Sequence, residues 1–178
     1  AFGEAGAVVT NNAEVADKIK LFRAHGESPK NTHNVVGYNF RMEGMQGAIL
    51  GVKLKYLDSW NEKRRNNAEL YSSLLKYNVI VPKVPEENLT SMHLYVIRHQ
   101  RREALREFLA SKGVDTGVHY EKPIHLQKAF AHLGYKEGDF PVAERVMKEI
   151  VSLPMCPMLS EEQIRYVCEC VKEFDRLQ

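Results

Sequence analysis

The sequence predicts a mixed fold, α/β passing into α+β, that is built in three successive parts. These parts are the edge of an α/β domain over 1–42, a long connecting helix over 43–77 and a small α+β domain over 78–178. Three observations lead to this prediction. A strand-like segment and a helical pattern open the chain, one long helical pattern without proline follows, and short strands and helices then alternate to the end.

The first part combines a short strand, a helix and a long loop. Residues 7–10 are apolar and are followed by asparagines, which is typical of a strand. Apolar residues then recur at helical spacing until Gly26, and the pair Asn11 and Glu14 is typical of a capping box at the helix start. The polar loop that runs from there to residue 42 is long enough to suggest a functional role.

The second part is a helical pattern over 43–77 that contains no proline. A continuous helix of this extent would be about 50 Å long at ~1.5 Å per residue, which exceeds the diameter of a small domain. We therefore expect the helix to bend, to break or to connect two domains.

The third part contains short elements of both kinds, as expected for an α+β domain. We expect strands at 79–81, 93–98 and 151–153, an extended piece at 114–120, helices at 101–112 and 140–150, and a last amphipathic helix that opens with a capping box at 160–163.

Composition excludes several classes of protein. Hydrophobic residues make up 44% and charged residues 27%, which is usual for a soluble globular protein, and no apolar run approaches the ~18 residues of a membrane span. The net charge of +2 gives no sign of the strongly basic face that nucleic-acid binding requires. The 3 cysteines cannot all pair and lack the spacing of a zinc site, so we expect a cytoplasmic protein without a metal. The opening residues carry no secretory signal and are typical of a chain entered midway.

The segment 37–42 (Gly-Tyr-Asn-Phe-Arg-Met) resembles the GxNxR motif of the DegT-type sugar aminotransferases. These enzymes use pyridoxal 5'-phosphate (PLP) and have the aspartate-aminotransferase-like fold. Further segments resemble the family in the same order along the chain: 3–10, 23–26, 93–96, 117–120, 123–127, 138–141 and 152–155. Ala5 stands where the family usually has glycine. Because the motifs follow one another over almost the whole chain, together they are far more specific than any single one.

The resemblance implies a function for the intact protein. It would transfer an amino group from an amino-acid donor, typically glutamate, to a keto group of a nucleotide-activated deoxysugar, most similar to dTDP-linked ones. Residues 1–42 would form the C-terminal edge of the large PLP-binding domain with its active-site loop, and the enzyme would be a homodimer with shared active sites. The Schiff-base lysine would lie just upstream of Ala1, so we nominate no catalytic residue here. Residues 1–178 alone are expected to be inactive.

Five residues are candidates for ligand binding. The resemblance implies that Asn39 contacts the phosphate of PLP bound to the partner subunit, and that Arg41, whose planar guanidinium suits a diphosphate, faces the nucleotide-sugar. It implies that His125 contacts the nucleotide-sugar or the amine donor, and His119 and Tyr120 are further substrate-binding candidates. The residues alone leave other roles open. Asn39 could support a turn, Arg41 could form a salt bridge onto the long helix, and the last two could face the core.

Two alternatives remain at the level of sequence. Family members that carry histidine in place of the lysine are PLP-dependent sugar dehydratases, and the residues before Ala1 would distinguish the two. The other alternative is a non-catalytic dimerisation or regulatory module with the same fold.

Overall fold

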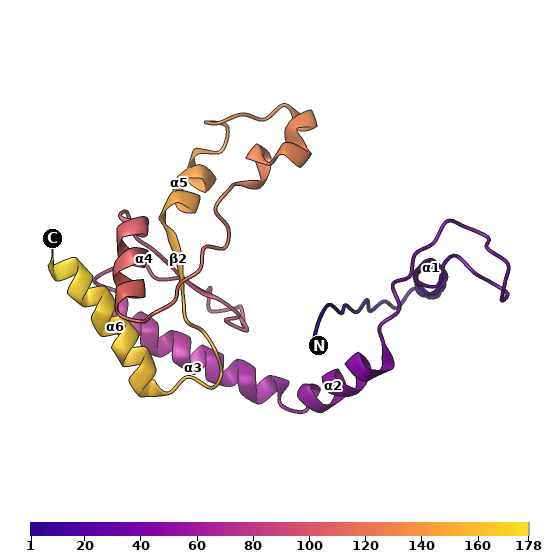
Figure 1. Cartoon of the computed structure of the whole chain (residues 1–178), viewed down its shortest axis with the longest axis horizontal. Coiled ribbons are helices and arrows are strands. Elements are labelled where there is room, and N and C mark those ends of the chain that lie inside the picture. Colours follow the sequence, from indigo (N-terminus) through magenta and orange to yellow (C-terminus); the bar gives the residue numbers. More distant parts are fainter. Residues whose placement is uncertain (178) are drawn as a thin grey trace. The chain divides into compact units, whose positions relative to one another are not determined.

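The computed structural model describes residues 1–177 and divides the chain into two compact units, Ala1–Leu57 and Asp58–Gln178. The elements, labelled in Figure 1, are α1 (Ala13–Arg23), α2 (Gly44–Leu54), α3 (Leu57–Leu75), β1 (Tyr95–Arg98), α4 (Arg102–Ser111), the 3₁₀ helices η1 (Ile124–Leu126) and η2 (Lys128–Leu133), α5 (Pro141–Glu149), β2 (Ile150–Leu153) and α6 (Glu161–Arg176). Among residues 1–177, no helix is both long and apolar enough to cross a membrane.

The first unit confirms the predicted helix but not the predicted strand. Helix α1 begins after Asn12, whose side-chain oxygen accepts from the backbone N–H of Val15 at 3.2 Å. The predicted capping box at Asn11 was therefore wrong by one residue. Residues 7–10 are exposed and form no strand. A strand is stable only when a neighbouring strand takes up its backbone hydrogen bonds, and no described segment pairs with this one.

The predicted long helix is broken between Leu54 and Leu57, so α2 and α3 are separate helices. Asp58 stands in the first turn of α3, where a carboxylate interacts favourably with the helix dipole. The expected bend or break is thus confirmed, and it lies at the point where the compact units divide.

The second unit is organised around two antiparallel strands that are far apart in the sequence. Strand β1 pairs with β2 from Tyr95 opposite Leu153 to Arg98 opposite Ile150. Single bridges extend this pair on both sides, Ile80 to Arg98 and Gly117 to Ser152. The predicted strand at 79–81 and the extended piece at 114–120 therefore each contribute one bridge rather than a full strand.

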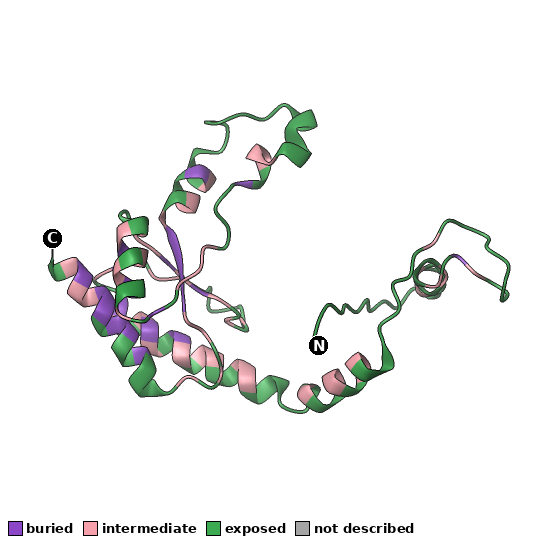
Figure 2. Cartoon of the chain, viewed as in Figure 1, coloured by how far each residue is buried: buried purple, intermediate pink, exposed green. Residues whose placement is uncertain are grey.

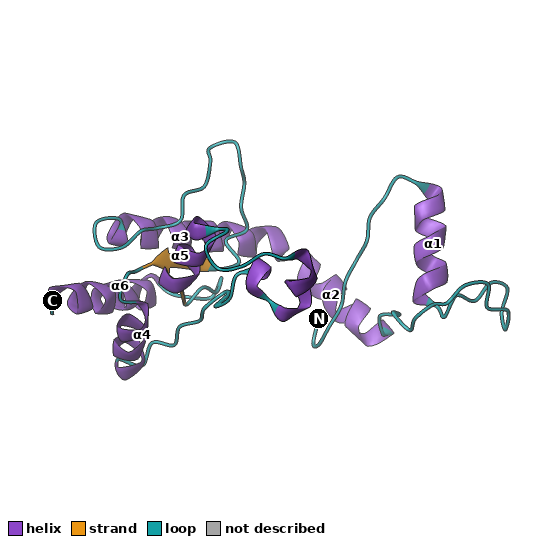
Figure 3. Ribbon diagram, turned by 90° about the horizontal axis from the view of Figure 1, so that it is seen from above, coloured by secondary structure: helices purple, strands orange, loops and turns teal. Residues whose placement is uncertain are grey.

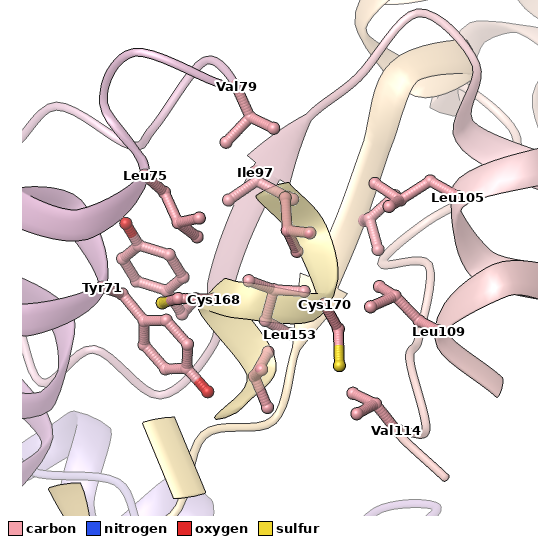
Figure 4. Packing of buried hydrophobic residues seen from close by; sticks show 14 of the residues in the cluster. Tyr71, Leu75, Val79, Ile97, Leu105, Leu109, Val114, Leu153, Cys168 and Cys170 are labelled. Carbon is pink, nitrogen blue, oxygen red and sulfur yellow. The ribbon is translucent and has the colours of Figure 1, made fainter. Parts of the chain in front are cut away.

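Helices α3, α4 and α6 pack around these strands, as Figures 1 and 3 show from two directions. The buried residues gather here, whereas Gly26 is the one buried residue that is described in the first unit (Figure 2). Figure 4 shows Tyr71 and Leu75 from α3, Leu109 from α4 and Cys168 from α6 within one apolar cluster. This core belongs entirely to the second unit.

Two buried tyrosines in this core have hydrogen-bonded hydroxyl groups. The Tyr71 and Tyr95 rings stack at 4.8 Å, Tyr71 donates to the Pro154 carbonyl at 3.0 Å, and the Tyr95 hydroxyl lies 2.8 Å from Ser72 Oγ. Burial raises the pKa of Tyr95 to about 12 and that of Tyr71 further above its ordinary value. Both phenols are therefore neutral, satisfied parts of the core.

Replacing Leu75 by alanine should lower the free energy of unfolding by about 2–5 kcal/mol, because it leaves a cavity in a packed core. Leu75 is fully buried, and Leu89, which is 82% exposed, provides the matched control. Leu89→Ala should change the free energy of unfolding by less than about 0.5 kcal/mol. Urea titration followed by circular dichroism measures both variants. Equal effects of the two substitutions would contradict the assigned core.

Candidate functional site

The segment that contains Asn39 and Arg41 is held against the C-terminal end of α1. Tyr38 donates its backbone N–H to the Phe22 carbonyl at 2.7 Å, Phe40 donates to the Arg23 carbonyl at 3.0 Å, and Asn39 forms an antiparallel bridge with Ala24. The backbone is therefore extended, and alternate side chains point to opposite sides.

This alternation separates two aromatic rings from two polar side chains. The Tyr38 and Phe40 rings stack at 5.0 Å with an angle of 8° between them. Arg41 donates from Nε to Asn39 Oδ1 at 3.1 Å. The two exposed polar groups thus act as one unit.

Two glycines permit the close approach of the backbone that positions this unit. A Cβ on Gly26, whose φ is +69°, would lie 1.8 Å from the Val35 carbonyl oxygen, and a Cβ on Gly37 would lie 2.1 Å from the Gly26 nitrogen. Neither distance is compatible with a side chain. The sequence predicted a helix stop at Gly26, but it did not predict the close approach of Gly26 and Gly37.

The exposed pair has the donors that an anion requires. The bond to Arg41 uses the Oδ1 oxygen of Asn39 and not its amide nitrogen. Within residues 1–177, no side chain or carbonyl accepts a hydrogen bond from this nitrogen, so both of its hydrogens are available to a ligand. An amide N–H and a guanidinium suit phosphate oxygens, so these residues fit the phosphate of PLP and the diphosphate of a nucleotide-sugar. In the described part of the chain, no three His, Cys, Asp or Glu side chains gather in a way that could hold a metal ion.

His119 is oriented by a serine from β2. Its Nδ1 lies 2.8 Å from the Oγ of Ser152, which is 5% exposed. The backbones of Ser152 and Gly117 exchange hydrogen bonds of 2.8 and 3.1 Å. A Cβ on Gly117 would lie 2.7 Å from the imidazole, so a side chain there would displace the ring from this position. Tyr120 meets the ring edge-on at 5.4 Å and is 70% exposed.

His125 is bonded to the carboxylate of Glu144, which is not among the five residues predicted from the sequence. Its Nε2 lies 3.0 Å from Glu144 Oε1, and the two side chains are only 9% and 11% exposed. Glu144 also accepts the backbone N–H of Gly138 at 3.0 Å and that of Phe140 at 3.2 Å. The Phe140 ring lies 4.7 Å from the imidazole. One carboxylate therefore fixes both the histidine and the loop before α5.

One feature of the sequence indicates that Glu144 can accept hydrogen bonds from the loop before α5. Glu144 stands in the first turn of α5, three residues after Pro141 at the helix start, where a glutamate can reach back to free backbone N–H groups. The Gly138 N–H foremost, and then the Phe140 N–H and His125, hold the pKa of Glu144 below its ordinary value.

Glu144→Gln should make the protein less stable at neutral pH and should flatten its acid dependence. A lowered folded-state pKa gives stabilisation that is present above the unfolded pKa of about 4.5 and is lost as pH falls through the folded value. Thermal unfolding between pH 7 and pH 3 measures the stability of the wild type and of the variant. Glu137→Gln is the control, because the Glu137 side chain is 77% exposed. The difference in stability between the wild type and Glu144→Gln should become smaller in acid. A difference in stability that does not change with pH would contradict a stabilising role for the Glu144 charge.

The five predicted residues fall into three local groups. Asn39 and Arg41 lie together in the first unit, His119 lies with Tyr120 in the second, and His125 lies with Glu144.

Residues 1–172 match the profile of the DegT/DnrJ/EryC1/StrS aminotransferase family. The chain belongs to this family. This membership confirms the resemblance drawn from the motifs. The chain spans about half the length of the curated relatives it matches.

Similar proteins of this family include regulators and transaminases by name. A pleiotropic regulatory protein of Geobacillus stearothermophilus is 46% identical over 99% of this chain and 48% of its own length. The dTDP-3-amino-3,6-dideoxy-alpha-D-galactopyranose transaminase of Aneurinibacillus thermoaerophilus is 37% identical over 95% of this chain and 46% of its own length.

Solved structures share the fold of this chain. S. venezuelae DesV superposes with a TM-score of 0.89 at 35% identity, covering 94% of this chain and 46% of its own. A DegT/DnrJ/EryC1/StrS aminotransferase from Brucella abortus gives a TM-score of 0.86 at 33% identity, covering 93% and 45%. The predicted fold class is therefore confirmed.

Proposed function

We propose that the intact protein is a PLP-dependent enzyme that transfers an amino group from glutamate to a keto group of a nucleotide-activated, dTDP-linked deoxysugar. Family membership and the dTDP-sugar transaminases among the relatives support this proposal. The observation that carries it is the hydrogen-bonded pair Asn39 and Arg41, two exposed anion-binding groups on a segment braced against α1.

In this proposal each side chain has a separate task. PLP, when bound, supplies an electron sink for the carbon that carries the amino group. Asn39 donates to the phosphate of PLP held by the partner subunit of a homodimer, and Arg41 binds the diphosphate of the nucleotide-sugar. His119, held by Ser152, and the exposed Tyr120 contact the sugar or the donor. His125 contacts the same ligands from its Glu144 anchor.

We also propose a division of labour along the chain. Residues 1–42 complete the large PLP-binding domain, 43–77 connect it to the small domain, and 78–178 form that small domain. The protein acts in the cytoplasm, where nucleotide-sugars and glutamate are made.

The direct test supplies the full-length protein and PLP with a dTDP-linked keto-deoxyhexose and glutamate. We expect the aminated sugar nucleotide and 2-oxoglutarate to form in equal amounts. Mass spectrometry measures both products. Loss of a sugar hydroxyl without consumption of glutamate would instead indicate the dehydratase. Neither product, with a competent panel of nucleotide-sugars, would overturn the proposal.

A regulatory role is the second candidate, and the name of the Geobacillus stearothermophilus relative favours it. A regulator of this kind would bind PLP or nucleotide-sugar without turnover. The same assay, combined with binding measurements, separates the two functions.

Residues 1–178 alone should hold no covalently bound PLP. The resemblance implies that the Schiff-base lysine lies upstream of Ala1, and Lys18, Lys20 and Lys55 stand in exposed positions in or at the end of helices. The measurement is the absorbance of PLP that survives gel filtration with the purified 178-residue chain. A band that persists and disappears on borohydride treatment with a mass increase on one lysine would contradict this prediction.

A further inference from the structure

A cleft of about 660 Å³ lies in the second unit. It is bounded by the chain after α3, the end of β1, the loop before α4 and side chains of α5 and α6. The volume is in the range of small-molecule sites, roughly 300–1,000 Å³. None of the five candidate residues of the proposed active site lines it.

The two carboxylates of the cleft already have partners. Glu149 Oε2 accepts from Arg98 Nε at 2.9 Å and from Arg98 Nη2 at 2.6 Å. Asp175 Oδ1 lies 3.3 Å from His99 Nε2. These contacts fix the floor of the cleft and pair the charge of Glu149 with that of Arg98.

Three cations of the cleft remain without a carboxylate. Within residues 1–177, no acidic group lies at ion-pair distance from Lys76, Arg101 or Arg145. The Arg101 guanidinium stacks 4.7 Å from the centre of the Phe174 ring, and Lys76 Nζ lies 4.9 Å from that of Tyr77. Such contacts orient a cation without neutralising it. The cleft therefore carries an excess of positive charge.

Apolar surface adjoins these cations. Tyr77 is 89% exposed and Ile80 is 54% exposed, and both line the cleft. An exposed aromatic face next to basic groups suits a ligand that combines a flat ring with phosphates.

We propose that this cleft binds a nucleoside diphosphate. Arg101, Arg145 and Lys76 bind its phosphates, and Tyr77 stacks on its base. The proposal is independent of the function assigned to Asn39 and Arg41, because the two sets share no residue.

The test titrates uridine diphosphate and pyrophosphate into the full-length, PLP-loaded protein by calorimetry, in an Arg41→Ala background that weakens the proposed active site. A binding event should remain in this background. Adding Arg101→Gln and Arg145→Gln should weaken it at least ten-fold for both probes, since each change removes a charge-assisted contact. Tyr77→Ala should weaken the binding of uridine diphosphate but not that of pyrophosphate, which has no base.

Lys148→Gln is the matched control, because Lys148 is also a cation on α5 but its side chain is 76% exposed and does not line the cleft. It should leave both affinities unchanged. Lys76→Gln provides a second cleft variant if the double substitution impairs folding. Absence of any binding in the Arg41→Ala background, or binding that no cleft substitution weakens, would overturn the proposal.

Discussion

Arg41→Ala should weaken binding of the nucleotide-sugar to the full-length protein by about 10- to 150-fold. A charge-assisted contact to a diphosphate contributes on the order of 1.5–3 kcal/mol, which corresponds to this factor. Arg41 is exposed, and its Nε is bonded to Asn39, so the guanidinium is oriented but not neutralised. Calorimetric titration with the nucleotide-sugar measures the effect.

The control for this result is Arg165→Ala. Arg165 is a half-exposed arginine on α6 that pairs with Glu161 and contacts none of the five candidate residues in the hydrogen bonds and ion pairs of the described chain. Its removal should leave nucleotide-sugar affinity unchanged. Equal losses in both variants would show that Arg41 acts only through the general charge of the protein.

Asn39→Ala should have a different signature. It should lower the retention of PLP during dialysis while changing nucleotide-sugar affinity less than Arg41→Ala does. Because Arg41 loses its bond to Asn39 Oδ1 in this variant, some coupling between the two substitutions is expected. A loss of nucleotide affinity without any loss of PLP would contradict the assignment of the two roles.

The shared site can be tested by mixing subunits. One subunit carries Asn39→Ala and Arg41→Ala, and the other lacks the Schiff-base lysine. If both residues act across the dimer, each hybrid contains one intact site and regains up to about half of the wild-type activity. No recovery after demonstrated subunit exchange would show that the residues serve their own subunit.

Gly37→Ala should disrupt the loop that presents this pair and abolish the binding that depends on it. Its Cβ would lie 2.1 Å from the Gly26 nitrogen, and the neighbouring atoms are backbone, which cannot rotate away. Overpacking of this kind costs about 1–3 kcal/mol where the structure can adjust, and the bridge between Ala24 and Asn39 would have to open. Both PLP retention and nucleotide-sugar affinity should therefore fall together.

Gly51→Ala is the matched control. Gly51 lies inside α2 with no atom within 4 Å of an added Cβ, so alanine should stabilise the helix by up to about 1 kcal/mol and leave binding intact. If Gly37→Ala bound both ligands like the wild type, the close approach of Gly26 and Gly37 would not be required for the site.

The sequence by itself determined the features that depend on neighbours within a few residues. The capping box of α6 is an example, because Ser160 and Gln163 bond each other's backbone N–H groups. Helices α4 and α5 also agree with their predicted apolar spacing. The motifs identified the family and the candidate pair Asn39 and Arg41 before any contact was known.

Only the tertiary structure decided the features that join distant segments. Residues 7–10 and 79–81 have the composition of strands, but a strand also requires a bonded neighbour, and composition cannot supply one. The orientation of His119 by Ser152 and the anchoring of His125 by Glu144 join residues 33 and 19 positions apart. Such contacts arise when packing of the core fixes the helices and strands, because a hydrogen bond depends on distance in space and not on position in the chain.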